Sequence, residues 1–250
     1  MTTLAMFPDL KAPDPPAGID LRCCDVAEVL AEVTGATLVV ADPPWVYGQR
    51  ISGSGKGADD HYECLAMADI LGHLRLALAC CGPSARCVVW TTHSQMPEFL
   101  SHAVRADDVT TLGGWRWVTG GTWAKVGADG AKGGRGAPGI GYHALSSESE
   151  PWLLLAGPGP HRRANVSGCR VIPRHRGRGE EHSEKPVEYQ REMIRGWTEP
   201  GDLVLDLYAG LGSVARACKA EGRRYIGAEI DPARHERALA KLATYRPETL

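Results

Sequence analysis

Short apolar runs alternate with amphipathic stretches along most of the chain after residue 18. Runs such as Leu38-Val39-Val40 are continuous, which is typical of strands buried on both faces of a parallel sheet. The stretches between them repeat apolar residues at helical spacing. Strands are predicted over residues 19–23, 38–41, 87–91, 115–123, 152–156, 203–206 and 225–228, and helices over residues 26–33, 67–80, 97–106, 187–197, 214–221 and 233–245. This alternation predicts an α/β fold, a doubly wound sheet with helices on both faces.

Three stretches depart from this alternation of strand-like and helix-like segments. Residues 1–18 are proline-rich and predict a flexible N-terminal arm, which leaves residues 19–250 as a single domain. The chain is rich in glycine near residues 110–145 and in arginine near residues 158–182. Because neither stretch shows strand or helix periodicity beyond the strand at 115–123, both predict insertions that face a substrate.

Composition and charge narrow the function classes. The chain has 250 residues and a net charge of -2, so nucleic-acid binding would require a local basic surface. No apolar run reaches the length of a membrane helix and no secretory leader begins the chain, which predicts a cytoplasmic protein without membrane association. The eight cysteines include no C-x-x-C pair, so we expect buried, reduced thiols and no metal site.

The first candidate motif is an apolar strand that ends at Asp206 and turns through Gly210 and Gly212 into a helix. Glycines allow the backbone to approach a ligand closely, and a strand-end acid can hold a cationic or hydroxyl-bearing group. The next strand ends at Glu229, where a carboxylate suits ribose hydroxyls. A purely structural turn is the alternative, but the glycine turn with two acids favours a nucleoside cofactor.

The second candidate motif is Asp42-Pro43-Pro44-Trp45, directly after another apolar strand. Prolines donate no backbone hydrogen bond, so a carboxylate and backbone carbonyls present only acceptors, which suits a planar amino group. Trp45 would stack on the base that carries this amine. A turn with a buried tryptophan is the alternative, although ligands in α/β sheets bind at this end of the strands.

These motifs together resemble a known family. Asp42-Pro43-Pro44-Trp45 is similar to the amino-methyltransferase signature in the form of adenine-N6 enzymes, and the segment from Asp206 to Ser213 is similar to their S-adenosylmethionine motif. The order of the two motifs resembles the circularly permuted, beta-class arrangement. Residues 182–186 resemble the segment before the cofactor motif of that class, and Asp25 resembles the acid that contacts the cofactor's adenine. Tyr62 and residues 141–155 resemble the branch that includes messenger-RNA adenine methyltransferases.

The resemblance implies a Rossmann-like methyltransferase that moves a methyl group from S-adenosyl-L-methionine to adenine N6. The strands before Asp42 and Asp206 should be neighbours. The implied catalytic residues are Asp42, Pro43, Pro44 and Trp45, and the implied cofactor-binding residues are Asp25, Ser183, Lys185, Asp206, Tyr208, Gly210, Gly212 and Glu229. Tyr208 stands where beta-class DNA enzymes commonly carry phenylalanine.

Several alternatives stay open. An intact cofactor motif favours DNA over RNA as the partner, in a bacterial or phage-infected cell, and a homodimer or a partner subunit is compatible with the family. A cytosine-N4 enzyme would typically carry serine in place of Asp42, and a catalytically silent binding subunit would keep the same fold. Phosphate contacts are expected from the arginine-rich stretch, namely from Arg162, Arg163, Arg174, Arg176 and Arg178. A solvated loop is the alternative for that stretch.

Overall fold

The computed structural model describes residues 18–45, 64–103, 112, 114–126, 149–161, 164–173 and 184–247. The predicted N-terminal arm therefore lies outside the described residues, except for Gly18. Much of the glycine-rich and arginine-rich stretches lies outside them as well.

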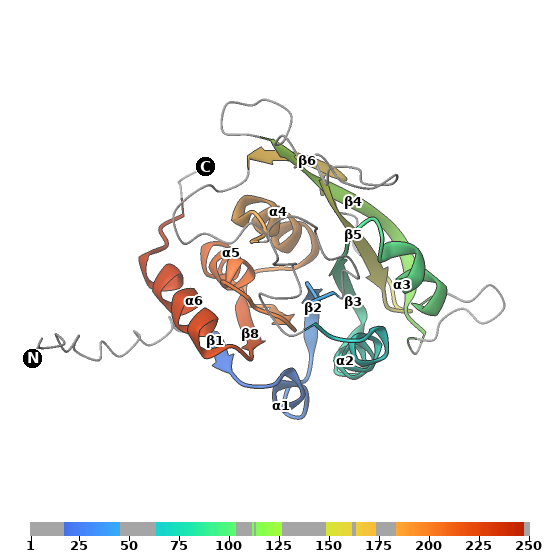
Figure 1. Cartoon of the computed structure of the whole chain (residues 1–250), viewed down its shortest axis with the longest axis horizontal. Helices are drawn as coiled ribbons and strands as arrows, with labels where there is room; N and C mark the ends of the chain where they lie inside the picture. Colours follow the sequence, from blue (N-terminus) through green and yellow to red (C-terminus); the bar gives the residue numbers. More distant parts are fainter. Residues whose placement is uncertain are drawn as a thin grey trace, which may run out of the picture.

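One eight-stranded sheet runs through the molecule in the order β1-β8-β7-β2-β3-β5-β4-β6 (Figure 1). The strands are β1 (Ile19–Cys23), β2 (Ala36–Ala41), β3 (Cys81–Trp90), β4 (Arg116–Val126), β5 (Ser149–Ala156), β6 (Cys169–Pro173), β7 (Leu203–Asp206) and β8 (Arg224–Glu229). From β1 to β3 all neighbours are parallel. The predicted parallel sheet is thus correct for that half of the molecule.

The other half of the sheet is mixed, which corrects the expectation of a parallel sheet throughout. Strand β5 runs antiparallel to both β3 and β4, and β6 runs parallel to β4. Apolar continuity, as in the Trp152–Ala156 part of β5, reports burial on both faces but not strand direction. Strand β6 was not predicted, because its residues are mostly exposed at the edge of the sheet and lack an apolar pattern.

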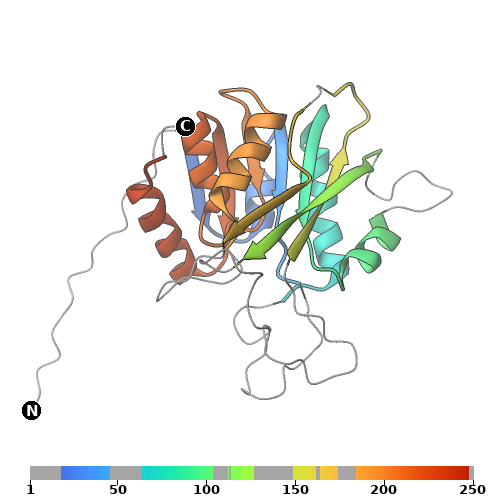
Figure 2. The same ribbon diagram turned by 90° about the horizontal axis from the view of Figure 1, so that it is seen from above.

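Helices cover both faces of the sheet, as Figure 1 and Figure 2 show together. The helices are α1 (Val26–Leu30), α2 (Met67–Ala79), α3 (Met96–Ala103), α4 (Val187–Trp197), α5 (Ser213–Glu221) and α6 (Pro232–Thr244). One core packs α1, α2 and α3 against one face, and a second core packs α4, α5 and α6 against the other. None of the helices in the described part of the chain is long and apolar enough to cross a bilayer.

Local sequence signals explain where the helices start. Asp25 caps α1 by accepting from the Ala27 amide at 2.7 Å, with Glu28 completing a capping box. Asp231 caps α6 by accepting from the Ala233 amide at 2.8 Å, and Pro232 occupies the first helical position. Both caps follow strands that end in the same region, so they also fix how the chain leaves the sheet there.

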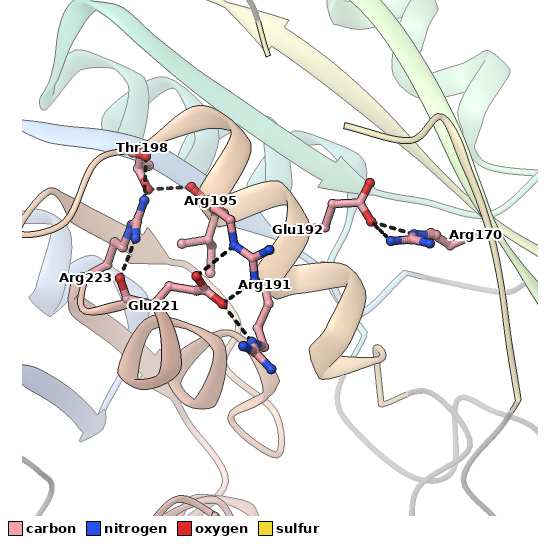
Figure 3. A network of polar contacts seen from close by, with 8 residues as sticks. Arg170, Arg191, Glu192, Arg195, Thr198, Glu221 and Arg223 are labelled. Carbon is pink, nitrogen blue, oxygen red and sulfur yellow. Dashed lines mark hydrogen bonds and ion pairs between the residues drawn. The ribbon is translucent and has the colours of Figure 1, made fainter. Parts of the chain in front are cut away.

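A polar network joins α4 to α5 on the outside of the second core (Figure 3). The Glu221 carboxylate accepts from Arg191 at 2.7 Å and from Arg195 at 2.8 Å, and these arginines hold the pKa of Glu221 below its usual value. Arg223 donates to the Thr198 hydroxyl at 3.0 Å and to the Thr198 carbonyl at 2.7 Å. This network lies away from the strand ends that carry the candidate motifs, and we assign it a structural role.

The cysteines are all reduced, but the expected burial is wrong for most of them. Only Cys87 and Cys218 are buried, whereas Cys23 and Cys169 are exposed. The exposed pair lie at the ends of the edge strands β1 and β6, where an apolar neighbour in sequence does not imply a packed environment.

Candidate active site

The two candidate motifs meet at the carboxyl ends of neighbouring strands. Strand β2 pairs with β7 in parallel, with Val40 opposite Asp206. The expected adjacency of these strands is therefore confirmed. Strand β8 continues the sheet beside β7, and β1 beside β8 with Cys23 opposite Glu229. The ends of four parallel strands thus bring Asp42, Asp206, Glu229 and Asp25 to one edge of the sheet.

A cavity of about 460 Å³ opens at this edge. Its volume is in the range of small-molecule and cofactor sites. The predicted site residues that line it are Asp25, Asp42, Pro43, Pro44, Trp45, Lys185, Asp206, Tyr208, Gly210 and Glu229. Among the described residues, no group of three histidine, cysteine or acidic side chains is arranged to hold a metal ion.

Asp42 is held by a buried lysine. Lys185 Nζ lies 2.5 Å from Asp42 Oδ2 and 3.0 Å from Glu150 Oε2, and Glu150 also pairs with Lys125. The Lys185 side chain is only 7% exposed, whereas that of Asp42 is 33% exposed at the cavity. We call Asp42, Lys185, Glu150 and Lys125 the acceptor-side charge chain.

Opposite charges alternate along the acceptor-side charge chain, and this alternation shifts the pKa values of its side chains. Burial alone would raise the pKa of Glu150, but Lys185 and Lys125 hold it below the usual value. Burial would lower the pKa of Lys185, but its two carboxylate partners raise it, so the lysine stays protonated. Burial raises the pKa of Asp42 in spite of Lys185.

The sequence analysis missed the parts of this chain that lie on β4 and β5. Glu150 belongs to the stretch 141–155, which carried a family resemblance without a residue role, and Lys125 was given no role. Lys185 was predicted to contact the cofactor, but its ammonium faces the two carboxylates. Lys125 and Glu150 lie on distant segments of the chain, and their pairing gives no sequence signal. It forms because β4 and β5 are antiparallel neighbours.

Asp206 is buried at the end of β7 and has no cationic partner among the described residues. Its carboxylate accepts from the Tyr225 hydroxyl at 3.0 Å, and only 2% of the residue is exposed. Burial is the largest cause that raises its pKa to about 7. A cation entering the cavity would favour the ionised form.

Glu229 supports the glycine turn. Its carboxylate accepts from the Gly210 amide at 2.8 Å and from the Asp231 amide at 3.0 Å, yet burial keeps its pKa above the usual value. Each carboxylate oxygen retains a lone pair for a further donor. Glu229 therefore both shapes the turn and offers acceptors to a ligand.

The two glycines of the turn differ in what requires them. Gly210 has φ +54° with open space where a Cβ would lie, and it lines the cavity. Gly212 has φ +73°, and a Cβ there would come within 3.3 Å of the Ala238 side chain. Close packing of the turn against α6, rather than the cavity, explains the second glycine.

Tyr208 and Trp45 form aromatic walls of the cavity in different ways. The Tyr208 hydroxyl lies 2.9 Å from His73 Nδ1 on α2, a residue that the sequence analysis did not assign. Trp45 is 2% exposed, donates its indole N–H to the Trp90 carbonyl at 3.1 Å, and packs edge-on against Phe99. Stacking of Trp45 on a base would require a face of this anchored ring to open toward the cavity, and it stays a prediction.

Some predicted site residues lie outside the described residues. These are Ser183, Tyr62 and the five arginines Arg162, Arg163, Arg174, Arg176 and Arg178. Within the arginine-rich stretch the structure describes Arg170, which pairs with Glu192 of α4. The phosphate-binding role of the stretch stays a prediction.

Comparisons with known proteins agree with this architecture. A family model for N6/N4 methyltransferases, described as DNA methylase, matches residues 115–241. That range includes Lys185, Asp206 and Glu229 but not Asp42. The type II methyltransferase M.XycI of Xanthomonas campestris pv. cyanopsidis is 47% identical over 47 residues, which are 19% of this chain and 16% of that relative. The chain thus matches this curated relative over only a small part of its length.

Two solved structures share the fold at low sequence identity. M1.HpyAVI in complex with SAM has a TM-score of 0.63 at 16% identity, covering 91% of this chain and 100% of that chain. The cytosine-N4-specific PvuII DNA methyltransferase has a TM-score of 0.66 at 16% identity, covering 94% of this chain and 90% of that chain. The predicted Rossmann-like methyltransferase sheet with helices on both faces is confirmed, and the permuted motif order stays a prediction.

Proposed function

The chain belongs to the DNA methylase family, and from this membership we propose that it transfers a methyl group from S-adenosylmethionine to the N6 amine of adenine in DNA. The observation that carries the proposal is the state of Asp42 at the cavity. Lys185 occupies one carboxylate oxygen, Oδ2, and a third of the side chain remains exposed. The other oxygen, Oδ1, is then the acceptor offered to an exocyclic amine.

The opposite wall of the cavity fits the cofactor. Buried Asp206 has no cationic partner in the described part of the chain, and Glu229 accepts from two backbone amides with Arg234 nearby. A cationic group therefore complements Asp206, and ligand hydroxyls complement Glu229. Asp25 Oδ1 caps α1, which leaves its second oxygen for the amino group of the cofactor's adenine. Tyr208 and Gly210 line the space between these acids. When bound, S-adenosylmethionine supplies a methyl group already activated by a sulfonium.

Asp42 prepares the acceptor amine. The lone pair of adenine N6 is delocalised into the ring, so the amine is a poor nucleophile. Acceptance of an N6 hydrogen by Asp42 Oδ1 and by the Pro43 carbonyl favours a pyramidal nitrogen. The Pro43 carbonyl accepts from the Trp45 amide at 2.9 Å and keeps a second lone pair for this purpose.

Lys185 and Glu150 orient Asp42 and set its charge. Lys185 offsets part of the effect of burial on the pKa of Asp42, and in the proposed mechanism the Asp42 carboxylate faces the positive charge that develops on the attacking nitrogen. Since burial raises the pKa of Asp42, this carboxylate can then take the proton that the nitrogen loses. Lys185 itself stays protonated between two carboxylates and is unsuited to act as the base.

Cytosine N4 is the second candidate acceptor. One structural neighbour, the PvuII enzyme, is cytosine-N4-specific, and the family model covers both amines. Asp42 in place of the serine typical of cytosine-N4 enzymes supports adenine. Contacts from the arginine-rich stretch to phosphates would supply DNA affinity, because the net charge of -2 gives no general attraction.

Product analysis tests the proposal. The chain is incubated with S-adenosylmethionine and unmethylated DNA or RNA of mixed sequence, and the nucleosides are separated after digestion. We expect N6-methyladenine, formed in DNA faster than in RNA. N4-methylcytosine as the product would overturn the adenine assignment, and failure to bind S-adenosylhomocysteine would overturn the methyltransferase proposal as a whole.

A further inference from the structure

The turn before α4 places two adjacent, oppositely charged and buried side chains. Glu184 is 4% exposed at its side chain, and Lys185 follows it directly. Both line the cavity. The partners of Lys185, Asp42 and Glu150, line the cavity, whereas the partners of Glu184 lie on α5 and α6. This dipeptide therefore joins the acceptor-side charge chain to those two helices.

Glu184 binds the elements that carry the cofactor motif. Its carboxylate accepts from Arg216 of α5 and, at 2.6 Å, from Lys241 of α6. Arg216 also donates to the Gly212 carbonyl at 3.3 Å and lies over the Tyr245 ring. Glu184 is thereby linked through one side chain to the glycine turn.

Lys185 binds the acceptor wall through Asp42 and Glu150. Successive Cα atoms are only about 3.8 Å apart, so a displacement of Glu184 moves Lys185 as well. Resting on the function proposed above, we propose that Glu184 is a positioning residue that sets the distance between the cofactor's methyl group and the acceptor amine. It does so by tying the Lys185–Asp42 pair to the α5 and α6 side of the cavity.

The proposal predicts a specific kinetic signature. A misplacement of about 1 Å can reduce the rate of a reaction about 100-fold without touching the chemistry. Loss of the Glu184 anchor should therefore lower kcat, while the groups that bind cofactor and DNA remain. A residue that only stabilises the helix would instead lower the melting temperature and leave kcat per folded molecule unchanged.

Two variants test this in the full chain. Glu184→Ala removes both ion pairs, and Glu184→Gln keeps the shape and one acceptor, which keeps the test valid if the alanine variant does not fold. At saturating S-adenosylmethionine and DNA, we expect kcat to fall about 100-fold for Glu184→Ala and about 10-fold for Glu184→Gln. Calorimetric Kd values for S-adenosylhomocysteine and for DNA should stay within about threefold.

Glu192→Gln is the matched control. Glu192 lies on α4, accepts from the Ser167 amide at 2.6 Å and pairs with Arg170, outside the cavity. We expect a lower melting temperature with unchanged kcat. The proposal is overturned if both Glu184 variants keep kcat within about threefold of wild type, if Kd rises in parallel with the loss, or if Glu192→Gln loses as much. A wild-type chain without methyl transfer would instead contradict the proposed function.

Discussion

The two walls of the cavity handle buried carboxylates in opposite ways. On the acceptor side, Asp42 and Glu150 are paired with Lys185 and Lys125 in the acceptor-side charge chain. On the cofactor side, Asp206 accepts from a tyrosine hydroxyl and Glu229 from two backbone amides, with Arg234 nearby.

This difference indicates which wall is electrostatically complementary to a charged ligand. Burying an ionised group is costly, and burial raises the pKa of both cofactor-side acids, although Arg234 partly offsets this for Glu229. The acceptor-side charge chain is balanced by its own lysines and suits a neutral base. On the cofactor side, Asp206 has no cationic partner among the described residues, and a sulfonium cofactor with an ammonium group would supply that positive charge.

The variant with the largest expected effect is Asp42→Ala, which removes a carboxylate from the acceptor wall. Because the proposed function has Asp42 facing the acceptor amine, we expect nearly all methyl transfer to be lost, with affinity for S-adenosylhomocysteine within a few-fold of wild type. Radiolabel transfer to DNA measures the first quantity and calorimetry the second. Retention of more than about a tenth of the activity, an effect of only about 1.4 kcal/mol, would contradict the assigned role.

Glu229→Ala removes a carboxylate from the cofactor wall. The variant loses the acceptor of the Gly210 amide and, in the proposed site, the charge-assisted hydrogen bonds to ribose hydroxyls. We expect cofactor binding to weaken by about 1.5–3 kcal/mol, or about 10- to 100-fold, with little change in DNA affinity. Unchanged cofactor affinity in a titration would move the ribose contact to another acid, with Asp231 next in line.

The difference between the two walls also predicts that stability and cofactor affinity depend on pH through Asp206. Its folded pKa of about 7 exceeds that of an unfolded aspartate, so its contribution to the stability of the free protein is full at low pH and is lost as pH rises through about 7. Ionised Asp206 is also the form that a cationic cofactor requires. Affinity should therefore fall about tenfold per pH unit below pH 7.

Asp206→Asn is the control for that pH dependence. The variant cannot ionise, so its cofactor affinity should be weak and flat across the range in which wild type changes, and the free protein should not lose stability there. Calorimetry and thermal melts at pH 6 and pH 8 measure both. A wild-type affinity that is the same at the two pH values would show that Asp206 does not meet the cofactor's charge.

The sequence predicted the cofactor wall better than the acceptor wall for a physical reason. Asp206, Gly210 and Glu229 lie within one strand–turn–helix–strand unit, where local pattern fixes geometry. The partners of Asp42 come from segments more than a hundred residues away along the chain. Lys185 reaches Asp42 from the segment before α4, and Glu150 reaches Lys185 because β5 inserts antiparallel beside β3. Strand direction leaves no mark on apolar periodicity.

The edge strand β6 could not be predicted from the sequence either. Strand β6 buries little apolar surface, so its position is set by backbone pairing with β4 rather than by pattern. By contrast, the helix starts at Val26 and Val187 were predicted to the residue. A capping box marks the first start, and Pro186 directly precedes the second.

The smallest expected effect concerns how the cofactor wall is held from α2. Tyr208 stands where related enzymes commonly carry phenylalanine, and its additional hydroxyl meets His73 at 2.9 Å. We expect Tyr208→Phe and His73→Leu each to weaken cofactor binding by about 0.5–1.5 kcal/mol, the usual worth of one hydrogen bond. Because both variants remove the same contact, the double variant should lose little more than either single variant.

Tyr189, a tyrosine that does not line the cavity, separates this local effect from general destabilisation. Tyr189→Phe removes a hydroxyl that donates to the Ser167 carbonyl at 2.8 Å and accepts from Trp152, within the second core. It should lower the melting temperature without changing cofactor affinity. If the losses of Tyr208→Phe and His73→Leu simply add, the two side chains act independently, and α2 does not position the cofactor wall through this hydrogen bond.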